Sequence, residues 1–522
     1  MDKNTKLLVI ISLVIILMGI GTASANEINP IDGSTSIQDT PTTVHADPQY
    51  AQENLNASTD TKEVSDTSPT TLYREEKNIK EATYTVDSSN IGRYFDLEDG
   101  TTTKNVKEND TIVLSGDFER IEFYIDKVGL KVIGKDATIR NGRIIVSDEA
   151  GNNTVSNLTI STTGYENAIL NLAENSNITN NKVTVKNTDT VTEGIRNEAK
   201  YVIIANNTVN VEGPSKNINF DSDERKNMAY TFGIVNIANN TLIENNTVYA
   251  KKHKDGANEN MGTIDAIEVQ GQADDTVSNV TINKNIVKVS DGRFVYGINV
   301  LNSVDHIQVT NNDVKAESSR YSNGIQLGND ATNCLIQNNK VDVKIVNATQ
   351  EEDSVSFGII ATNTVAIGTE NITIKGNEVK LNASIGYAFE VYDVHNSTVT
   401  GNTINASGEF MMGIGISGSK NINVTKNEMQ LNGNSTRTTT LAEYIPPANT
   451  GIHLQAESDN AIIRENHVRI TDKNNNAKAV NVEDSNNVSV CDNDLVADKL
   501  YGNDAVINTG SKMITVKNNT SP

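Results

Sequence analysis

Tryptophan is absent from the 522-residue chain, cysteine occurs twice, histidine six times and proline eight times. Two cysteines are too few for a small disulfide-stapled domain, and the histidines include no pair at a chelating spacing. A polytopic membrane protein is excluded because only one long apolar run exists, near the N-terminus. Hydrophobic residues make up only 36% of the chain and aromatic residues 5%, which is low for a compact globule. The net charge of −23 disfavours a nucleic-acid partner.

The N-terminus carries the three parts of a secretory signal. Two lysines precede an apolar run from Leu7 to Ile20, and Ala23-Ser24-Ala25 supplies a small-residue cleavage site. We predict a signal peptide over residues 1–25, since the run is short for the alternative, an uncleaved membrane anchor. The mature chain is then secreted or held at the cell surface, with no membrane span. Residues 26–88 are rich in Ser, Thr, Asn and Asp and lack an apolar period, which predicts a disordered spacer.

Asparagine is the residue in excess, and many copies fall in one recurring pattern. The pattern is an apolar residue, two variable residues, Asn, one variable residue, and then two apolar residues one position apart. One copy is Ile178-Thr-Asn-Asn181-Lys-Val183-Thr-Val185, and most copies are 25–27 residues apart. The pivotal residues, which we call the ladder asparagines, are Asn181, Asn207, Asn246, Asn285, Asn312, Asn339, Asn377, Asn402, Asn427, Asn466, Asn493 and Asn519.

A second marker, Gly-Ile or a close relative, lies upstream of most ladder asparagines, as in Gly297-Ile298 and Gly324-Ile325. Each unit therefore holds three short β-branched stretches of period 2: after the glycine, before the Asn and after the Asn. A unit this thin cannot bury its own apolar face, so the units must stack, which predicts an all-β parallel β-helix with three strands per coil. We expect each ladder Asn to take the left-handed dihedrals of a tight bend and to bond the Asn above and below.

These repeats resemble those of right-handed parallel β-helix proteins of the pectin-lyase-like class. The Asn-rich style and the secretory start are similar to adhesin-like surface proteins of methanogenic archaea. The resemblance covers about residues 89–522, and its first coils, up to about residue 175, are expected to be irregular. It implies a right-handed helix whose first strand follows the glycine, with a ligand face on the first sheet and the loops that feed it.

Extra chain length and aromatic residues share one edge of the predicted helix. The inserted segments lie between a third strand and the next glycine: residues 212–231, 251–264, 344–356 and 432–450. Candidate ligand-binding residues on that edge are Arg293, Phe294, Tyr296, Arg320, Tyr321, Tyr230, Phe232, Phe357 and Phe410. Rings can lie against sugar faces and guanidiniums bind carboxylates or sulfates. The alternative is that the rings close a corner of the core with the arginines stacked on them.

Catalytic motifs are weak, so no catalytic residue is assigned. A glycosidase needs two carboxyl groups about 5–10 Å apart, whereas Glu268 and Glu390 are predicted to lie four coils apart, about 19 Å. Both belong to an outward first-strand position that we expect to be solvated, together with His453. Hydrolases of the resembled class carry Gly-His-Gly and Arg-Ile-Lys, which this sequence lacks. No cofactor is assigned, with Ca²⁺ held by acids as the open alternative.

The two cysteines, Cys334 and Cys491, are predicted to lie five coils apart, about 24 Å, which is too far for a disulfide. We therefore expect two free thiols, with Cys334 buried. N-glycosylation sequons are abundant and include Asn206, Asn371 and Asn434.

The leading hypothesis is a secreted or cell-surface adhesin-like protein that binds glycans or neighbouring cell surfaces through loops and aromatics on one edge. The alternative is a carbohydrate-active enzyme, a polysaccharide lyase or glycoside hydrolase, acting on acidic polysaccharide. A further alternative is a structural rod of the envelope. The expected partner is a glycan or cell-surface polymer, and self-association through an open C-terminal coil beyond Asn519 is a second expectation.

Overall fold

The computed structural model describes residues 81–186, 191–213, 230–253, 263–272, 275–346, 354–364, 368–435 and 448–521. The predicted signal peptide, most of the predicted spacer and the larger part of each predicted loop lie outside these ranges. Within them, no helix has the length and apolar character needed to cross a membrane.

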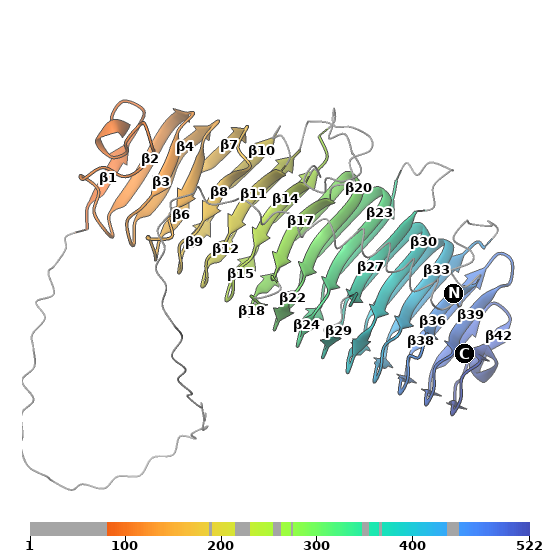
Figure 1. Ribbon diagram of the computed structural model, residues 1–522. Coiled ribbons are helices and arrows are strands. Elements are labelled where there is room, and N and C mark those ends of the chain that lie inside the picture. The colour runs from red at the N-terminus through yellow and green to blue at the C-terminus, as the bar shows by residue number, and fades with distance from the viewer. Residues whose placement is uncertain are drawn as a thin grey trace, which may run out of the picture. The chain divides into compact units, whose positions relative to one another are not determined.

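Three parallel sheets, each receiving one strand per coil, form the body of residues 81–521 (Figure 1). The first sheet contains β3 (Glu122–Ile125), β5 (Arg143–Val146), β8 (Asn167–Asn171), β11 (Val191–Asn197), β14 (Tyr230–Asn236), β17 (Thr263–Gln270), β27 (Val355–Thr362), β36 (Asn449–Gln455), β39 (Ala477–Glu483) and β43 (Val506–Thr509). The second contains β1 (Thr83–Val86), β2 (Thr111–Glu119), β4 (Lys131–Arg140), β6 (Thr154–Ser156), β9 (Asn177–Thr179), β12 (Ile203–Ala205), β15 (Leu242–Glu244), β19 (Thr281–Asn283), β22 (Gln308–Thr310), β25 (Leu335–Gln337), β29 (Thr373–Lys375), β32 (Thr398–Thr400), β34 (Asn423–Thr425), β37 (Ile462–Arg464), β40 (Ser489–Cys491) and β44 (Thr515–Lys517).

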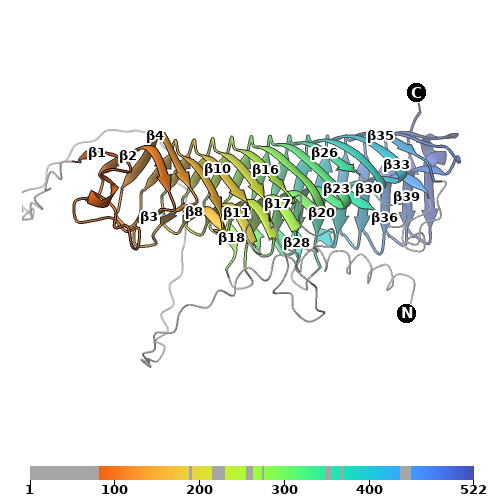
Figure 2. The same cartoon turned by 90° about the horizontal axis from the view of Figure 1, so that it is seen from above.

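The third sheet contains β7 (Thr159–Thr163), β10 (Lys182–Lys186), β13 (Thr208–Glu212), β16 (Thr247–Lys251), β26 (Lys340–Ile345), β35 (Glu428–Gly433), β38 (His467–Asp472) and β41 (Asp494–Ala497). Four long strands bend at a corner and belong to the third sheet first and then to the first sheet: β20 (Ile286–Leu301), β23 (Asp313–Gly328), β30 (Glu378–Tyr392) and β33 (Thr403–Ser417). A small fourth ladder joins β18 (Val277–Ser278), β21 (Val304–Asp305), β24 (Ala331–Thr332), β28 (Thr369–Glu370) and β31 (Val394–His395). Seen from above, the coils follow one another along a single axis (Figure 2). The chain is an all-β right-handed parallel β-helix, as predicted.

The core is a continuous apolar column because side chains of the same type stack from coil to coil. In the third sheet, Val183 pairs with Val209 and Val209 with Val248, and all three side chains are fully buried. Each buried Val or Ile contributes about 1.5–3 kcal/mol through the area removed from water. The 3₁₀ turn η1 (Ile91–Arg93) lies at the N-terminal end of the body, where Ile91 and Phe95 are part of the same cluster.

The ladder asparagines form one hydrogen-bonded column at the bend between the second and third sheets. Asn312 Nδ2 donates to Asn339 Oδ1 at 2.9 Å and to the carbonyl oxygen of Ile282 at 2.9 Å, and the Asn312 backbone N–H donates to the same Asn339 Oδ1. This pattern repeats from Asn181 to Asn519, and all twelve side chains are buried. Each amide thus forms hydrogen bonds with backbone N–H and carbonyl groups at the bend that have no partner within the sheets.

The predicted left-handed conformation of the ladder asparagines is wrong. The left-handed residue is the preceding one, such as Asn311 at φ 57°, and two coils place Gly376 and Gly401 there. The ladder side chain must point into the coil to reach its neighbours, so the reversal of the chain falls on the exposed residue before it. A second left-handed column lies six residues before the ladder and includes Asn279 and Asn371. Because Asn tolerates this conformation, three columns together explain its abundance.

The two ends of the stack differ from the prediction. β1 pairs in parallel with β2, so the stack begins at Thr83, inside the predicted spacer. The first coils pair in the same three sheets, with one register shift at Ser115 and Gly116. At the C-terminal end, β42 (Leu500–Tyr501) runs antiparallel to β41 and leads into the 3₁₀ turn η3 (Gly502–Ala505). The third sheet therefore does not end as an open parallel edge, and self-association stays a prediction.

Both cysteines are free, as predicted, and both are buried, although burial was predicted only for Cys334. Cys334 lies between the coil positions of Ile307 and Ile372 in the apolar column. Burial raises the pKa of the Cys334 thiol to about 12, so this side chain behaves as a small apolar group.

Replacing Asn339 by Ala should lower the free energy of unfolding by about 3 kcal/mol or more, because it removes the acceptor of two Asn312 N–H groups and the donor to the Val309 carbonyl. Replacing the adjacent Asn338 by Gly should change it by less than about 0.5 kcal/mol, because its φ of 55° suits glycine. Urea unfolding of the two variants measures both values, and equal losses would contradict the ladder's role.

Candidate functional site

The glycine of each Gly-Ile marker lies where the first sheet approaches the third. A Cβ on Gly297 would lie 2.2 Å from Val314 Cγ1 and 2.5 Å from the carbonyl oxygen of Gly324, so a larger side chain is excluded. Strand pairing skips this residue: Tyr296 pairs with Asn323, and Ile298 with Ile325. The register is the same on both sides of the glycine, so neighbouring strands bend together here. At this glycine bend, the residue before the glycine and the residue after the isoleucine face the same outer side.

Two columns of outward side chains result from this bend. Outer column A contains Glu193, Phe232, Asp265, Tyr296, Asn323, Phe357, Tyr387, Met412, Thr450 and Lys478, and outer column B contains Arg196, Val235, Glu268, Asn299, Gln326, Ile360, Glu390, Gly415, His453 and Asn481. Members of one strand contact each other. Asn323 Nδ2 donates to Gln326 Oε1 at 2.7 Å, and Arg196 Nη1 donates to Glu193 Oε1 at 2.9 Å.

The prediction that column B is solvated is wrong. Glu268, Asn299, Glu390 and His453 are each at most 4% exposed. The sequence argument treated each residue alone, whereas the glycine bend places a column A side chain beside it and the stack places neighbours above and below at about 4.8 Å.

Polar atoms on this buried face are incompletely paired. Within the described residues, no hydrogen-bond partner is found for Tyr296 Oη, Asn299 Oδ1, Glu390 Oε2 or His453 Nδ1. Native proteins pair nearly all buried polar groups, and leaving one unpaired costs about 1–3 kcal/mol. Their concentration on one sheet face therefore indicates a functional surface.

The predicted ligand-binding rings lie on the same outer face. They form two clusters separate from the main core: Phe294, Tyr296, Tyr321, Phe357 and Phe410 with three aliphatic residues, and Tyr230 and Phe232 with Val235. Phe294 stacks on Tyr321 in the next coil with ring centroids 4.9 Å apart and planes 7° apart. Every one of these rings is at most 9% exposed. They therefore neither close the core corner nor stand free in solvent.

The two predicted arginines lie over these rings in adjacent coils. The guanidinium carbon of Arg293 is 5.9 Å from the Phe294 centroid, and that of Arg320 is 5.3 Å from the Tyr321 centroid. Such a contact contributes about 0.5–1 kcal/mol and orients the guanidinium. Both side chains are half-buried.

An acid pair, not predicted from the sequence, occupies columns A and B on β17. Asn299 Nδ2 donates to Asp265 Oδ2 at 2.7 Å. Burial raises the pKa of Asp265, and burial together with the neighbouring Asp265 raises the pKa of Glu268 well above its ordinary value. Because two buried carboxylates in contact cannot both ionise, the pair holds a shared proton near neutral pH.

Glu390 and His453 lie on either side of Gly415 in column B. A Cβ on Gly415 would lie 2.1 Å from Glu390 Oε2, so the carboxyl group of Glu390 lies against the bare backbone of the next coil. Burial raises the pKa of Glu390 to about 8. Burial also lowers the pKa of His453, although Glu483 Oε2 is 3.5 Å from His453 Nε2 and opposes the shift. Glu390 is therefore protonated and His453 neutral at pH 7.

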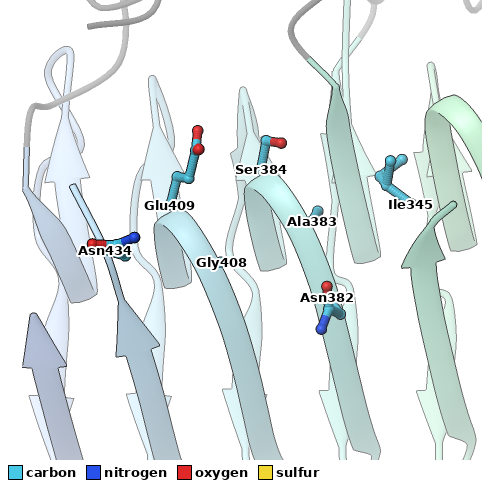
Figure 3. Close-up of a pocket in the computed structure, with 7 residues that line it drawn as sticks. All are labelled: Ile345, Asn382, Ala383, Ser384, Gly408, Glu409 and Asn434. Carbon is cyan, nitrogen blue, oxygen red and sulfur yellow. The ribbon is translucent and has the colours of Figure 1, made fainter. Parts of the chain in front are cut away.

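An open pocket of about 370 Å³ lies at the corner between the third and first sheets (Figure 3). Its lining is Ile345, Asn382, Ala383, Ser384, Gly408, Glu409 and Asn434. Ile345 and Asn434 belong to two of the predicted inserted segments, so the pocket lies on the edge that the sequence singled out. Apart from the sequon at Asn434, none of its residues was predicted to matter.

The outer-face acids were missed because the sequence argument counted strand alternation across the glycine. Because the strand bends at that position, the pattern x-Gly/Ala-Ile-x places Asp265 beside Glu268 and Glu193 beside Arg196. In the part of the chain that the structure describes, no three His, Cys, Asp or Glu residues are grouped to hold a metal ion. Binding of Ca²⁺ stays a prediction.

Comparison with known proteins finds no matching family model and no matching curated protein. Similar solved structures include the Dettilon tailspike protein, at 14% identity and a TM-score of 0.46 over 76% of this chain and 68% of that one. A PL6 alginate lyase in complex with a trisaccharide is 11% identical, with a TM-score of 0.39 over 77% and 85% of the two chains. The mannuronan C-5 epimerase AlgE4 A-module of Azotobacter vinelandii is 14% identical, with a TM-score of 0.35 over 79% and 90%. The fold assignment itself depends on the strand register above.

The raised pKa of Glu390 predicts a pH-dependent stability. Between its ordinary pKa of 4.5 and its folded value of about 8, the unfolded chain releases a proton that the folded chain keeps, so stability falls as pH rises through this window. Glu390→Gln removes this loss. The free energy of unfolding of this variant, relative to that of the wild type, should therefore increase by about 3 kcal/mol from pH 5 to pH 8.5.

Urea unfolding at the two pH values measures the gain, and the matched control is Glu378→Gln on the same strand, whose side chain is 49% exposed. The control should follow the wild-type pH profile. A Glu390→Gln profile parallel to the wild type would contradict the burial of this carboxyl group.

Proposed function

We propose that this chain is a secreted or cell-surface, adhesin-like protein that binds a glycan along the outer face of the first sheet. The observation that carries the proposal is the row of buried polar atoms without partners in columns A and B, next to stacked aromatic rings. A sugar ring offers hydroxyl groups that pair with such atoms and apolar C–H faces that pack on rings. A long repetitive surface also suits a repetitive polymer.

The charges on this face favour a polymer with some acidic groups. Arg293 and Arg320 in adjacent coils supply two planar cations that suit carboxylates or sulfates. The nearby acids oppose an anionic ligand less than their number suggests, because burial holds Glu390 and the Asp265–Glu268 pair partly protonated. The N-terminal signal in the sequence supports an extracellular location.

A glycan array with the intact protein tests this function. The double variant Arg293→Ala/Arg320→Ala should lose at least ten-fold in affinity for the glycan that the wild type binds, because each charge-assisted contact contributes about 1.5–3 kcal/mol. The matched control is Lys288→Ala/Lys315→Ala, an exposed cationic pair in the same adjacent coils but on the third sheet. Equal binding by both double variants would reject the site, and a wild type that binds no glycan would favour a purely structural rod.

The acid pair favours a second function, that of a carbohydrate-active enzyme on acidic polysaccharide. A carboxyl group that burial keeps protonated near neutral pH can act as a general acid or base, although a pair in contact does not have the separation of about 5–10 Å that a glycosidase needs. Asp265 and Glu268 would take these roles, with Tyr296 beside them in the next coil.

Incubation of the wild type with uronic-acid polysaccharides tests this second function. Ultraviolet absorbance detects unsaturated uronate, and a reducing-end assay detects hydrolysis. Either product should fall at least a hundred-fold in Glu268→Gln, a value that corresponds to removal of a general acid. A wild type that forms neither product rules the enzyme out and leaves the binding function in place.

A further inference from the structure

Three polar side chains stand in one row at the corner pocket. Ala383 pairs with Gly408, and Gly408 with Gly433. The residues that follow, Ser384, Glu409 and Asn434, therefore occupy one position in three adjacent coils. The Asn434 backbone N–H donates to the carbonyl oxygen of Glu409 at 3.3 Å, so the two coils remain in contact at this position. In Figure 3, Ser384 and Glu409 stand side by side on neighbouring strands, with Asn434 beyond them.

The pocket is hollow because the row is preceded by residues with little or no side chain. A Cβ on Gly408 would lie 1.8 Å from the carbonyl oxygen of Ala383, and one on Gly433 would lie 2.0 Å from Asn449 Nδ2. Close backbone packing therefore keeps the floor bare, and Ile345 supplies one apolar wall. The result is an open space of about 370 Å³, within the range of small-ligand sites.

The lining groups match the chemistry of a sugar ring. Asn382 and Asn434 each carry an amide that donates and accepts, Ser384 a hydroxyl group, and Glu409 a carboxylate that accepts several hydrogen bonds. Asn434 Oδ1 is buried without a hydrogen-bond partner among the described residues. Among the described residues of the lining, Glu409 is the only charged one, and its carboxylate would meet a uronic acid, a sulfate or a phosphate as a like charge.

We propose that this corner pocket binds one pyranose ring that carries no acid group, a neutral hexose or hexosamine. This inference rests on the proposed glycan-binding function and specifies a second contact point for the same ligand. Glu390 lies six residues after Ser384 on β30, and Gly415 lies six residues after Glu409 on β33. Six residues of strand span roughly 20 Å, so an oligosaccharide can extend from the pocket along these two strands onto the outer face of the first sheet.

An array of immobilised neutral, amino-sugar and uronic-acid oligosaccharides, probed with the full mature chain, tests the pocket. The wild type should bind chains that expose a neutral or amino sugar more tightly than chains made only of uronic acids. Ser384→Phe, which fills the pocket, and Glu409→Gln, which removes its carboxylate, should each weaken that binding at least ten-fold. The matched control is Glu428→Gln, an exposed acid on the third-sheet strand β35 of the same coil.

The outcomes separate the pocket from the function on which it rests. If Arg293→Ala/Arg320→Ala abolishes binding while both pocket variants bind normally, the pocket is rejected and the glycan-binding function stands. A wild type that binds nothing rejects both. Peptide mass spectrometry of the secreted protein gives an independent check, because an N-glycan on Asn434 would fill the pocket and overturn the inference. Circular dichroism of Ser384→Phe confirms that any loss is not a loss of fold.

Discussion

Stacking in exact register is the constraint on which the whole molecule depends, and the buried asparagine amide is the interaction that enforces it. A bend between two strands leaves backbone groups without ladder partners, and a buried bend cannot pair them with water. The Asn side chain satisfies them only if an identical side chain lies about 4.8 Å above and below. Asn312 shows the consequence, since its amide and its backbone N–H both depend on Asn339. Loss of register in one coil would therefore leave unpaired groups in two.

Because the register is kept from coil to coil, the bend at the first-strand glycine or alanine of each coil produces a continuous surface along the stack. A glycine or alanine is required before the first-strand isoleucine because the first and third sheets nearly touch there, as the 2.2 Å approach of a Cβ on Gly297 to Val314 shows. The bend at that residue leaves two side chains per coil on the outer face. Repetition then stacks Phe294 on Tyr321 and places Asp265 beside Tyr296. In a globular protein such a surface would have to be assembled from residues far apart in the sequence, whereas here repetition of one short motif produces it.

Burial of this outer face has an electrostatic consequence. Desolvation raises the pKa values of Glu268 and Glu390 and lowers that of His453, so the face carries fewer charges at neutral pH than its composition suggests. The chain as a whole is strongly acidic, yet its outer first-sheet face is built from rings, arginines and largely neutral acids. The corner pocket differs, since the carboxylate of Glu409 and the amides of Asn382 and Asn434 line an open edge.

The sequence by itself determined the coil period, the three sheets, the ladder asparagines and the free cysteines, because each follows from side-chain periodicity and from the needs of one repeated bend. It also located the edge where rings and inserted segments gather. It could not determine which residue of each bend is left-handed, that residues on both sides of Gly297 share one face, or that Asp265 and Glu268 form a buried pair. These features depend on how closely neighbouring coils and sheets approach, a distance that tertiary packing alone sets. For the same reason the pocket beside Glu409 appeared only when the bare backbones of Ala383 and Gly408 were placed side by side.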